Sequence, residues 1–76
     1  KMSVKEAMYN TALAEFHSQR DKAIATARIY LEHPVGIGEH PQVIDEFIKQ
    51  IKLAAEAEEA ASMLVDTFRD EITQED

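Results

Sequence analysis

The chain contains no cysteine and no tryptophan, and only two glycines and two prolines among its 76 residues. Without cysteine it forms neither a disulfide nor a thiolate metal site, which favours an intracellular, cytoplasmic protein. No apolar run approaches the roughly 20 residues of a membrane-spanning helix, so we expect no membrane association. Both glycines and both prolines lie within residues 34–41, and the sequence on either side holds nothing that interrupts a helix.

Basic residues are also scarce, since eight Lys and Arg stand against fifteen Asp and Glu for a net charge of −7. Residues 1–52 hold seven of each sign, whereas residues 53–76 hold eight acidic residues and one basic residue, Arg69. The acidic end would repel a phosphate backbone, so we predict no direct nucleic-acid binding. Two interpretations of residues 56–76 stay open: a solvated helix face, or a nucleic-acid mimic that blocks a host protein.

The first half of the chain has the pattern of one long helix. Ser3 and Glu6 have the spacing of a capping box, which predicts a helix start near residue 4. Apolar residues then recur at steps of three and four to about residue 31. Arg20 interrupts this stripe, and we expect its aliphatic stem to pack while its guanidinium reaches solvent.

A loop over residues 32–40 should separate this helix from a second one, because a residue that precedes proline disfavours the helical conformation. Pro41 suits the first position of the second helix, predicted over about 41–72. That helix carries the 4-3-4-3 seam of a coiled coil, with one charged member, Glu58, which either pairs with a cation across a dimer or fixes register. The seam consists of Phe47, Ile51, Ala54, Glu58, Ala61, Val65, Phe68 and Ile72.

The predicted fold is all-α: one domain, residues 1–76, folded as an antiparallel helical hairpin. Folding symmetrically about the loop sets Phe16 opposite Ala57 and Ala60, and Ala23 opposite Ile48, so that large residues meet small ones. A chain this short has little interior, and its apolar residues spread over more than one face. We therefore expect a homodimer that forms a four-helix bundle. The residues predicted for the hairpin and dimer core are Leu13, Phe16, Ile24, Phe47, Ile48, Ile51, Leu64, Val65 and Phe68.

The loop repeats the tripeptide Glu-His-Pro, at residues 32–34 and 39–41. It is our predicted binding site for a protein partner, through Val35, Gly36, Ile37, Gly38, Glu39 and His40. An alternative is a metal-binding hairpin with Glu32, His33, Glu39 and His40 as ligands. The preferred interpretation has no metal and no cofactor, because paired His-Pro sequences also punctuate helix ends. The sequence offers no nucleophile with a base and an oxyanion site, so we expect no enzymatic activity.

A family resemblance is visible at Tyr30, Leu31, residues 34–41, Ala57, Glu58 and Leu64. At these positions the chain resembles short uncharacterised helical proteins of T4-like tailed bacteriophages, including marine phages. The likeness covers roughly residues 9–65 and is sharpest in the loop. It implies a small phage accessory protein in the host cytoplasm, and it brings no reaction, cofactor or catalytic residue with it. Combined with the predicted bundle, it favours a function through self-association and through binding a host or phage protein.

Overall fold

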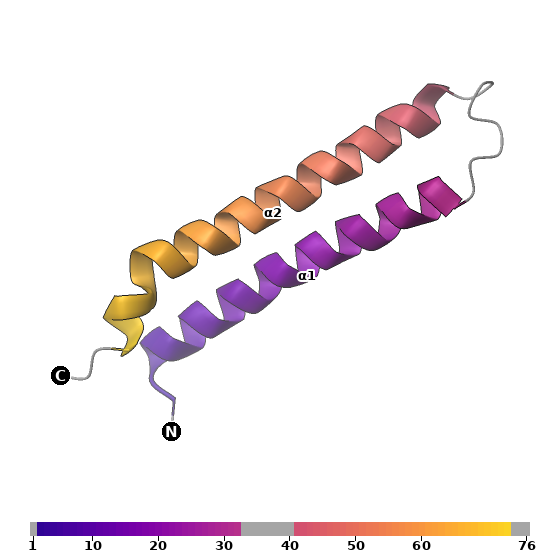
Figure 1. Ribbon diagram of the computed structural model, residues 1–76. Coiled ribbons are helices and arrows are strands. Elements are labelled where there is room, and N and C mark those ends of the chain that lie inside the picture. The colour runs from indigo at the N-terminus through magenta and orange to yellow at the C-terminus, as the bar shows by residue number, and fades with distance from the viewer. Residues whose placement is uncertain (1, 33–40, 74–76) are drawn as a thin grey trace.

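The computed structural model describes residues 2–32 and 41–73, which form two α-helices. Helix α1 (Val4–Glu32) and helix α2 (Pro41–Thr73) run side by side in opposite directions (Figure 1). The described residues contain no strand, so the predicted all-α hairpin is confirmed. Both helices end one residue beyond the predicted limits. Neither described helix combines the length and the hydrophobicity that crossing a bilayer requires.

The start of α1 has the geometry that its sequence predicts. The Ser3 Oγ accepts a hydrogen bond from the Glu6 backbone N–H at 3.1 Å, and the Glu6 carboxylate accepts one from the Ser3 N–H at 3.0 Å. Two N–H groups that the first helical turn leaves without a backbone partner are thereby satisfied. At the same end of the hairpin, Lys5 Nζ donates to the Glu71 carbonyl of α2 at 3.4 Å. The capping box therefore orders the first turn of α1, and Lys5 in that turn contacts the last turns of α2.

The core of the hairpin is made of small side chains. Four residues of the described chain are buried, two on each helix, and all are alanines with 4–5% of their surface exposed. They are Ala23 and Ala27 on α1, and Ala57 and Ala61 on α2. Each pair is spaced by four residues and therefore lies on one side of its helix. Alanine at the contact lets two helices approach closely, but it leaves the larger side chains around the margin of the interface.

The register of the two helices agrees with the prediction at one end only. Phe16 lines the same cleft as Ala57 and Ala60, as the symmetric fold predicts. Ala23 lies beside Gln50 and Leu53 in that cleft, about one turn along α2 from the predicted Ile48. A symmetric fold about the loop assumes that the two helices end at the same level. The contacts of Lys5 with Glu71 and of Arg20 with Glu58 show the register that the helices adopt instead.

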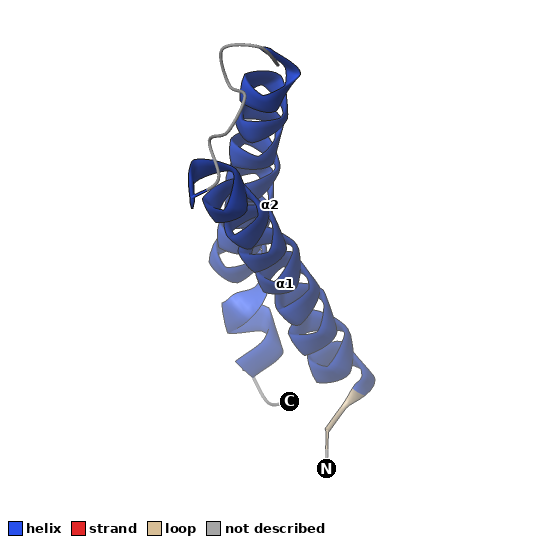
Figure 2. Cartoon of the chain, turned by 90° about the vertical axis from the view of Figure 1, so that its right-hand side faces the viewer, coloured by secondary structure: helices blue, strands red, loops and turns tan. Residues whose placement is uncertain are grey.

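The hairpin is a single layer. Its principal extents are 60 × 21 × 13 Å, and the smallest is about the diameter of one helix (Figure 2). The radius of gyration is 17.2 Å, against about 11 Å for a compact chain of this length. Stable helical domains place a second layer over the first. A single hairpin therefore leaves both broad faces uncovered.

Candidate interaction surface

Large apolar side chains lie at the surface of the described chain. None is fully buried, and eleven are classed as exposed, with values from 43% for Leu53 to 78% for Val4. The accessible surface is 5991 Å². A compact globular protein of this mass would expose about 4,700 Å². The excess of about 1,300 Å² is the first indication of an interaction surface.

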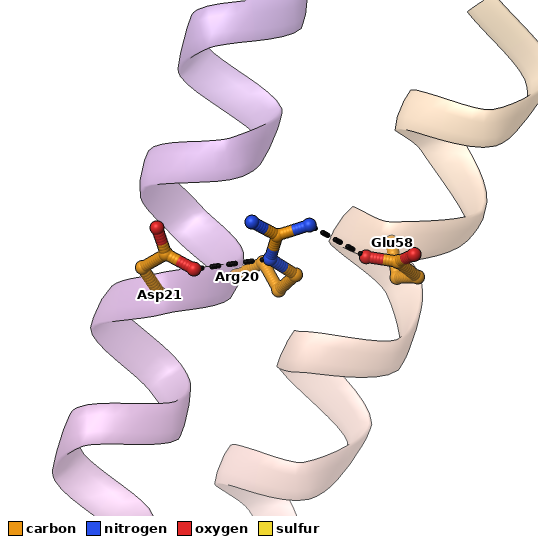
Figure 3. A network of polar contacts seen from close by, with 3 residues as sticks. All are labelled: Arg20, Asp21 and Glu58. Carbon is orange, nitrogen blue, oxygen red and sulfur yellow. Dashed lines mark hydrogen bonds and ion pairs between the residues drawn. The ribbon is translucent and has the colours of Figure 1, made fainter.

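A polar contact crosses between the helices near their centres. Arg20 Nη1 donates to Glu58 Oε1 at 2.9 Å, and Arg20 Nε donates to Asp21 Oδ1 at 3.0 Å (Figure 3). The Arg20 side chain is 29% exposed, whereas those of Asp21 and Glu58 are 66% and 62% exposed. The hydrogen bonds from Glu58 and then Asp21 raise the pKa of Arg20. Arg20 is therefore a fixed cation held between two anions.

Apolar residues flank this contact on both helices. An α-helix turns 100° per residue, so Leu13, Ile24 and Leu31 fall within about 40° of Arg20 around α1. On α2, Ile51 and Val65 lie one heptad on either side of Glu58 and share its face. We call this surface the Arg20–Glu58 face. Its members are Leu13, Arg20, Ile24, Leu31, Ile44, Phe47, Ile51, Glu58 and Val65.

Two clefts lie along the other broad side of the hairpin. One has a volume of about 390 Å³ and carries polar groups in its walls, including Gln19, Lys22 and Glu56. The other, of about 280 Å³, lies at the end of the hairpin that holds the two termini. It is lined by Lys5, Met8, Tyr9, Ala12, Leu64, Phe68 and Ile72. The broad side opposite the Arg20–Glu58 face is therefore mixed in the middle, where Phe16 and Leu53 lie beside these polar groups, and apolar at one end.

The nine residues predicted as core do not form a buried core within one chain. Leu13, Phe16, Ile24, Phe47, Leu64 and Val65 are half-buried. Ile48, Ile51 and Phe68 are exposed at 46%, 48% and 44%. The buried residues of the described chain are the four alanines instead. A role for the nine residues in a dimer core stays a prediction.

Most of the predicted loop site lies outside the described residues. This applies to all six residues of the binding prediction, Val35, Gly36, Ile37, Gly38, Glu39 and His40, and to His33 of the metal alternative. Glu32 is described, and it is the exposed last residue of α1. Over residues 2–32 and 41–73, no three His, Asp or Glu side chains gather in a way that would hold a metal ion. The loop predictions therefore stay open.

The acidic residues of α2 form an exposed row. Glu56, Glu59, Asp66 and Asp70 follow one another at intervals of three, seven and four residues, and all are exposed. Glu59 lies 100° around the helix from Glu58, so this row faces away from α1. Such a row would suit the solvent-facing outside of a helical bundle, and it would equally suit a mimic of nucleic acid. Both interpretations stay predictions.

Comparison of the chain with protein-family models, with curated proteins and with solved structures finds no match. The site therefore has to be argued from its own residues. Sequence reasoning identified Arg20 and Glu58 separately, as interruptions of two apolar stripes, but it did not join them within one chain. The signal that joins them is their opposite charge at central positions of two antiparallel helices. A fold that is symmetric about the loop does not predict this pairing, because in that register Arg20 and Glu58 do not lie opposite each other.

Proposed function

We propose that this chain is a non-enzymatic protein–protein interaction module whose first partner is a second copy of itself, so that two hairpins form a four-helix bundle. The observation that carries the proposal is the identity of the core. Among the described residues of one chain the buried ones are four alanines, while the isoleucines, leucines and phenylalanines are half-buried or exposed. Burial of large apolar side chains is the main favourable contribution to folding, and a second copy would supply it.

The surface area supports a partner of this size. The excess of about 1,300 Å² over a compact chain exceeds the roughly 800 Å² that each partner buries in a standard interface. Exposed apolar patches of several hundred Å² are uncommon on monomers and mark interaction sites. A hairpin that docks its broad face on a copy of itself gains a second layer. The exposed acidic row of α2 would then face solvent and keep the bundle dissolved.

The proposal includes a biological setting that rests on the resemblance alone. The likeness of the loop and its flanking residues to proteins of T4-like phages supports an accessory factor in the host cytoplasm. Such a factor would act by binding a host or phage protein. The loop residues 35–40 are our proposed contact for that protein. Self-association does not depend on this setting and is tested separately.

The test is the mass and the melting temperature of the intact chain as a function of concentration. We expect sedimentation equilibrium to give twice the 8.6 kDa chain mass at micromolar concentration and above. The midpoint of thermal unfolding should rise with concentration, because mass action favours the dimer. A monomer that melts cooperatively at one temperature over about a hundredfold range of concentration would contradict the proposal.

A further inference from the structure

Arg20 and Glu58 occupy equivalent places in the two helices. Arg20 lies two residues from the midpoint of α1, and Glu58 lies one residue from the midpoint of α2. Apolar residues lie on both sides of them along the Arg20–Glu58 face. The contact is therefore a polar layer at the centre of an otherwise apolar surface. A second copy that covers this face brings two such layers to the same level.

We propose that the second copy docks on the Arg20–Glu58 face about a two-fold axis parallel to the length of the hairpin, so that Arg20 of each chain lies against Glu58 of the partner subunit. The inference rests on the proposed self-association, and it names the interface and the orientation. In this arrangement α1 of each chain packs on α2 of the other. All four helices then have antiparallel neighbours, and both loops lie at one end of the bundle.

The charges of the central layer select this axis over the other two-fold axis available to two stacked hairpins. An axis parallel to the length places opposite charges over each other, so that positive and negative groups alternate around a square of Arg20, Glu58 and their two copies. An axis that crosses the helices places α1 on α1 and sets Arg20 over Arg20. Like charges in direct contact at an interface are unfavourable. The layer therefore favours the axis parallel to the length over the axis that crosses the helices.

The Arg20–Glu58 face and the opposite side differ in where their charges lie. On the Arg20–Glu58 face the charges form one central pair flanked by Leu13, Ile24, Ile51 and Val65, whereas the central cleft of the opposite side holds Lys22 and Glu56 beside Phe16 and Leu53. Glu58 and Val65 continue the heptad spacing from Ile51, as a helix seam requires.

The first test is a mixing experiment with a charge-exchanged chain, R20E/E58R. Within each R20E/E58R chain the negative residue lies on α1 and the positive residue on α2, so the ion pair is kept with its signs exchanged. A dimer of two such chains therefore still has alternating charges. Both chains carry Asp21→Asn as well, because Asp21 would otherwise repel Glu at position 20 in the exchanged chain alone. The two chains are given different masses by isotope labelling, unfolded together and refolded. Native mass spectrometry then counts the dimers of like chains and the mixed dimers.

We expect mixed dimers at about one-tenth of the share that random pairing gives, because each would set two pairs of like charges together. Mixed dimers at the random share would overturn the inference, since the polar layer would then not lie in the interface. Enriched mixed dimers would also overturn it, because they indicate the axis that crosses the helices. Absence of any dimer in the unaltered chain would instead overturn the proposed function itself.

The second test leaves Arg20, Asp21 and Glu58 unaltered. The chain has no cysteine, so a spin label attached through Glu32→Cys reports on one defined position at the exposed end of α1. With both loops at one end, the two labels should lie about 20–25 Å apart, across the width of the bundle. With the loops at opposite ends, each label lies about 18 Å from the centre along the axis, and their separation is about 40 Å. A distance distribution centred near the longer value would overturn the orientation.

Discussion

Arg20 Nη1 and Glu58 Oε1 lie 2.9 Å apart and connect α1 to α2 near the midpoints of both helices. Each residue interrupts the apolar stripe of its own helix, yet together they form one neutral layer. The buried residues of the two described helices are all alanines. The layer therefore adds direction and register to a contact that small apolar residues alone would define weakly.

Replacing Glu58 by Gln should lower the melting temperature slightly, and more so in low salt. The neutral amide keeps a hydrogen bond to Arg20 but loses the Coulomb attraction. Salt screens that attraction in the unaltered chain, with a Debye length of about 3 Å at 1 M, so the two chains should differ less at high salt. Circular dichroism melts at low and high ionic strength measure the difference. The matched control is Glu59→Gln, which removes the same charge from the next, outward-facing position. An equal loss for both variants at both ionic strengths would refute the role of the pair.

The contribution of the Arg20–Glu58 ion pair to stability should not change between neutral and mildly alkaline pH. Glu58 and Asp21 raise the pKa of Arg20 above its ordinary value. A cation whose pKa rises on folding stabilises the protein at every pH below its unfolded pKa, and the effect is lost only as pH rises through the folded value. The pH range over which this stabilisation is lost therefore lies above the range of usable buffers. A Glu58-dependent change in melting temperature between neutral pH and mildly alkaline pH would contradict the assignment.

The alanine contact should not tolerate larger side chains. Ala23→Leu inserts three heavy atoms where 4% of the residue is exposed, and we expect a loss of about 1–3 kcal/mol in the free energy of unfolding. Ala25→Leu is the control, because Ala25 is exposed two residues away on the same helix and its change should stay within about 0.5 kcal/mol. Urea titrations measure both. A tolerated Ala23→Leu would show that the helices do not meet at the alanines.

The capping box gives a further test at the start of α1. Ser3→Ala removes the hydroxyl that accepts the Glu6 N–H at 3.1 Å, and it should cost about 1 kcal/mol. Ser18→Ala, at an exposed position inside the same helix, should be neutral or slightly stabilising because alanine has the higher helix propensity. Urea titration of both variants provides the comparison. Equal effects would mean that the first turn frays with or without its cap.

Much of the fold could be predicted from local patterns in the sequence. The spacing of Ser3 and Glu6 located the start of α1, and Pro41 located the start of α2, because caps and prolines act on the backbone near them. Steps of three and four residues gave two helices, and the single loop made a hairpin. These predictions depend on neighbours within one turn. They need no knowledge of what lies across the molecule.

The contact between the helices was harder to predict because it depends on distant residues. Large apolar residues such as Ile51 and Phe68 fit the seam of a coiled coil, and they were assigned to the core on that ground. Within the described residues the buried side chains are alanines instead, Ala23 among them, because small side chains let two helices approach closely. The pairing of Arg20 with Glu58 follows from the register of the two helices. It could be found only after the register was known.

The last prediction separates the two broad sides of the hairpin with a matched pair of variants. Ile51 and Leu53 are exposed to similar extents, 48% and 43%, yet they lie about 160° apart around α2. Ile51 belongs to the Arg20–Glu58 face, whereas Leu53 lines the cleft on the other side. Ile51→Gln should weaken dimerisation by about 2 kcal/mol, or about thirtyfold in Kd, because both copies lose a contact.

Leu53→Gln should leave the dissociation constant within about threefold of the unaltered chain, because its side chain stays in the open cleft when the other face is covered. Sedimentation equilibrium measures both constants, and circular dichroism confirms that both variants keep their helices. If Leu53→Gln weakens the dimer and Ile51→Gln does not, the second copy covers the cleft side. Two equal and large losses would instead indicate that both faces are covered, as in a tetramer or a higher assembly, and the bundle would need four hairpins or more.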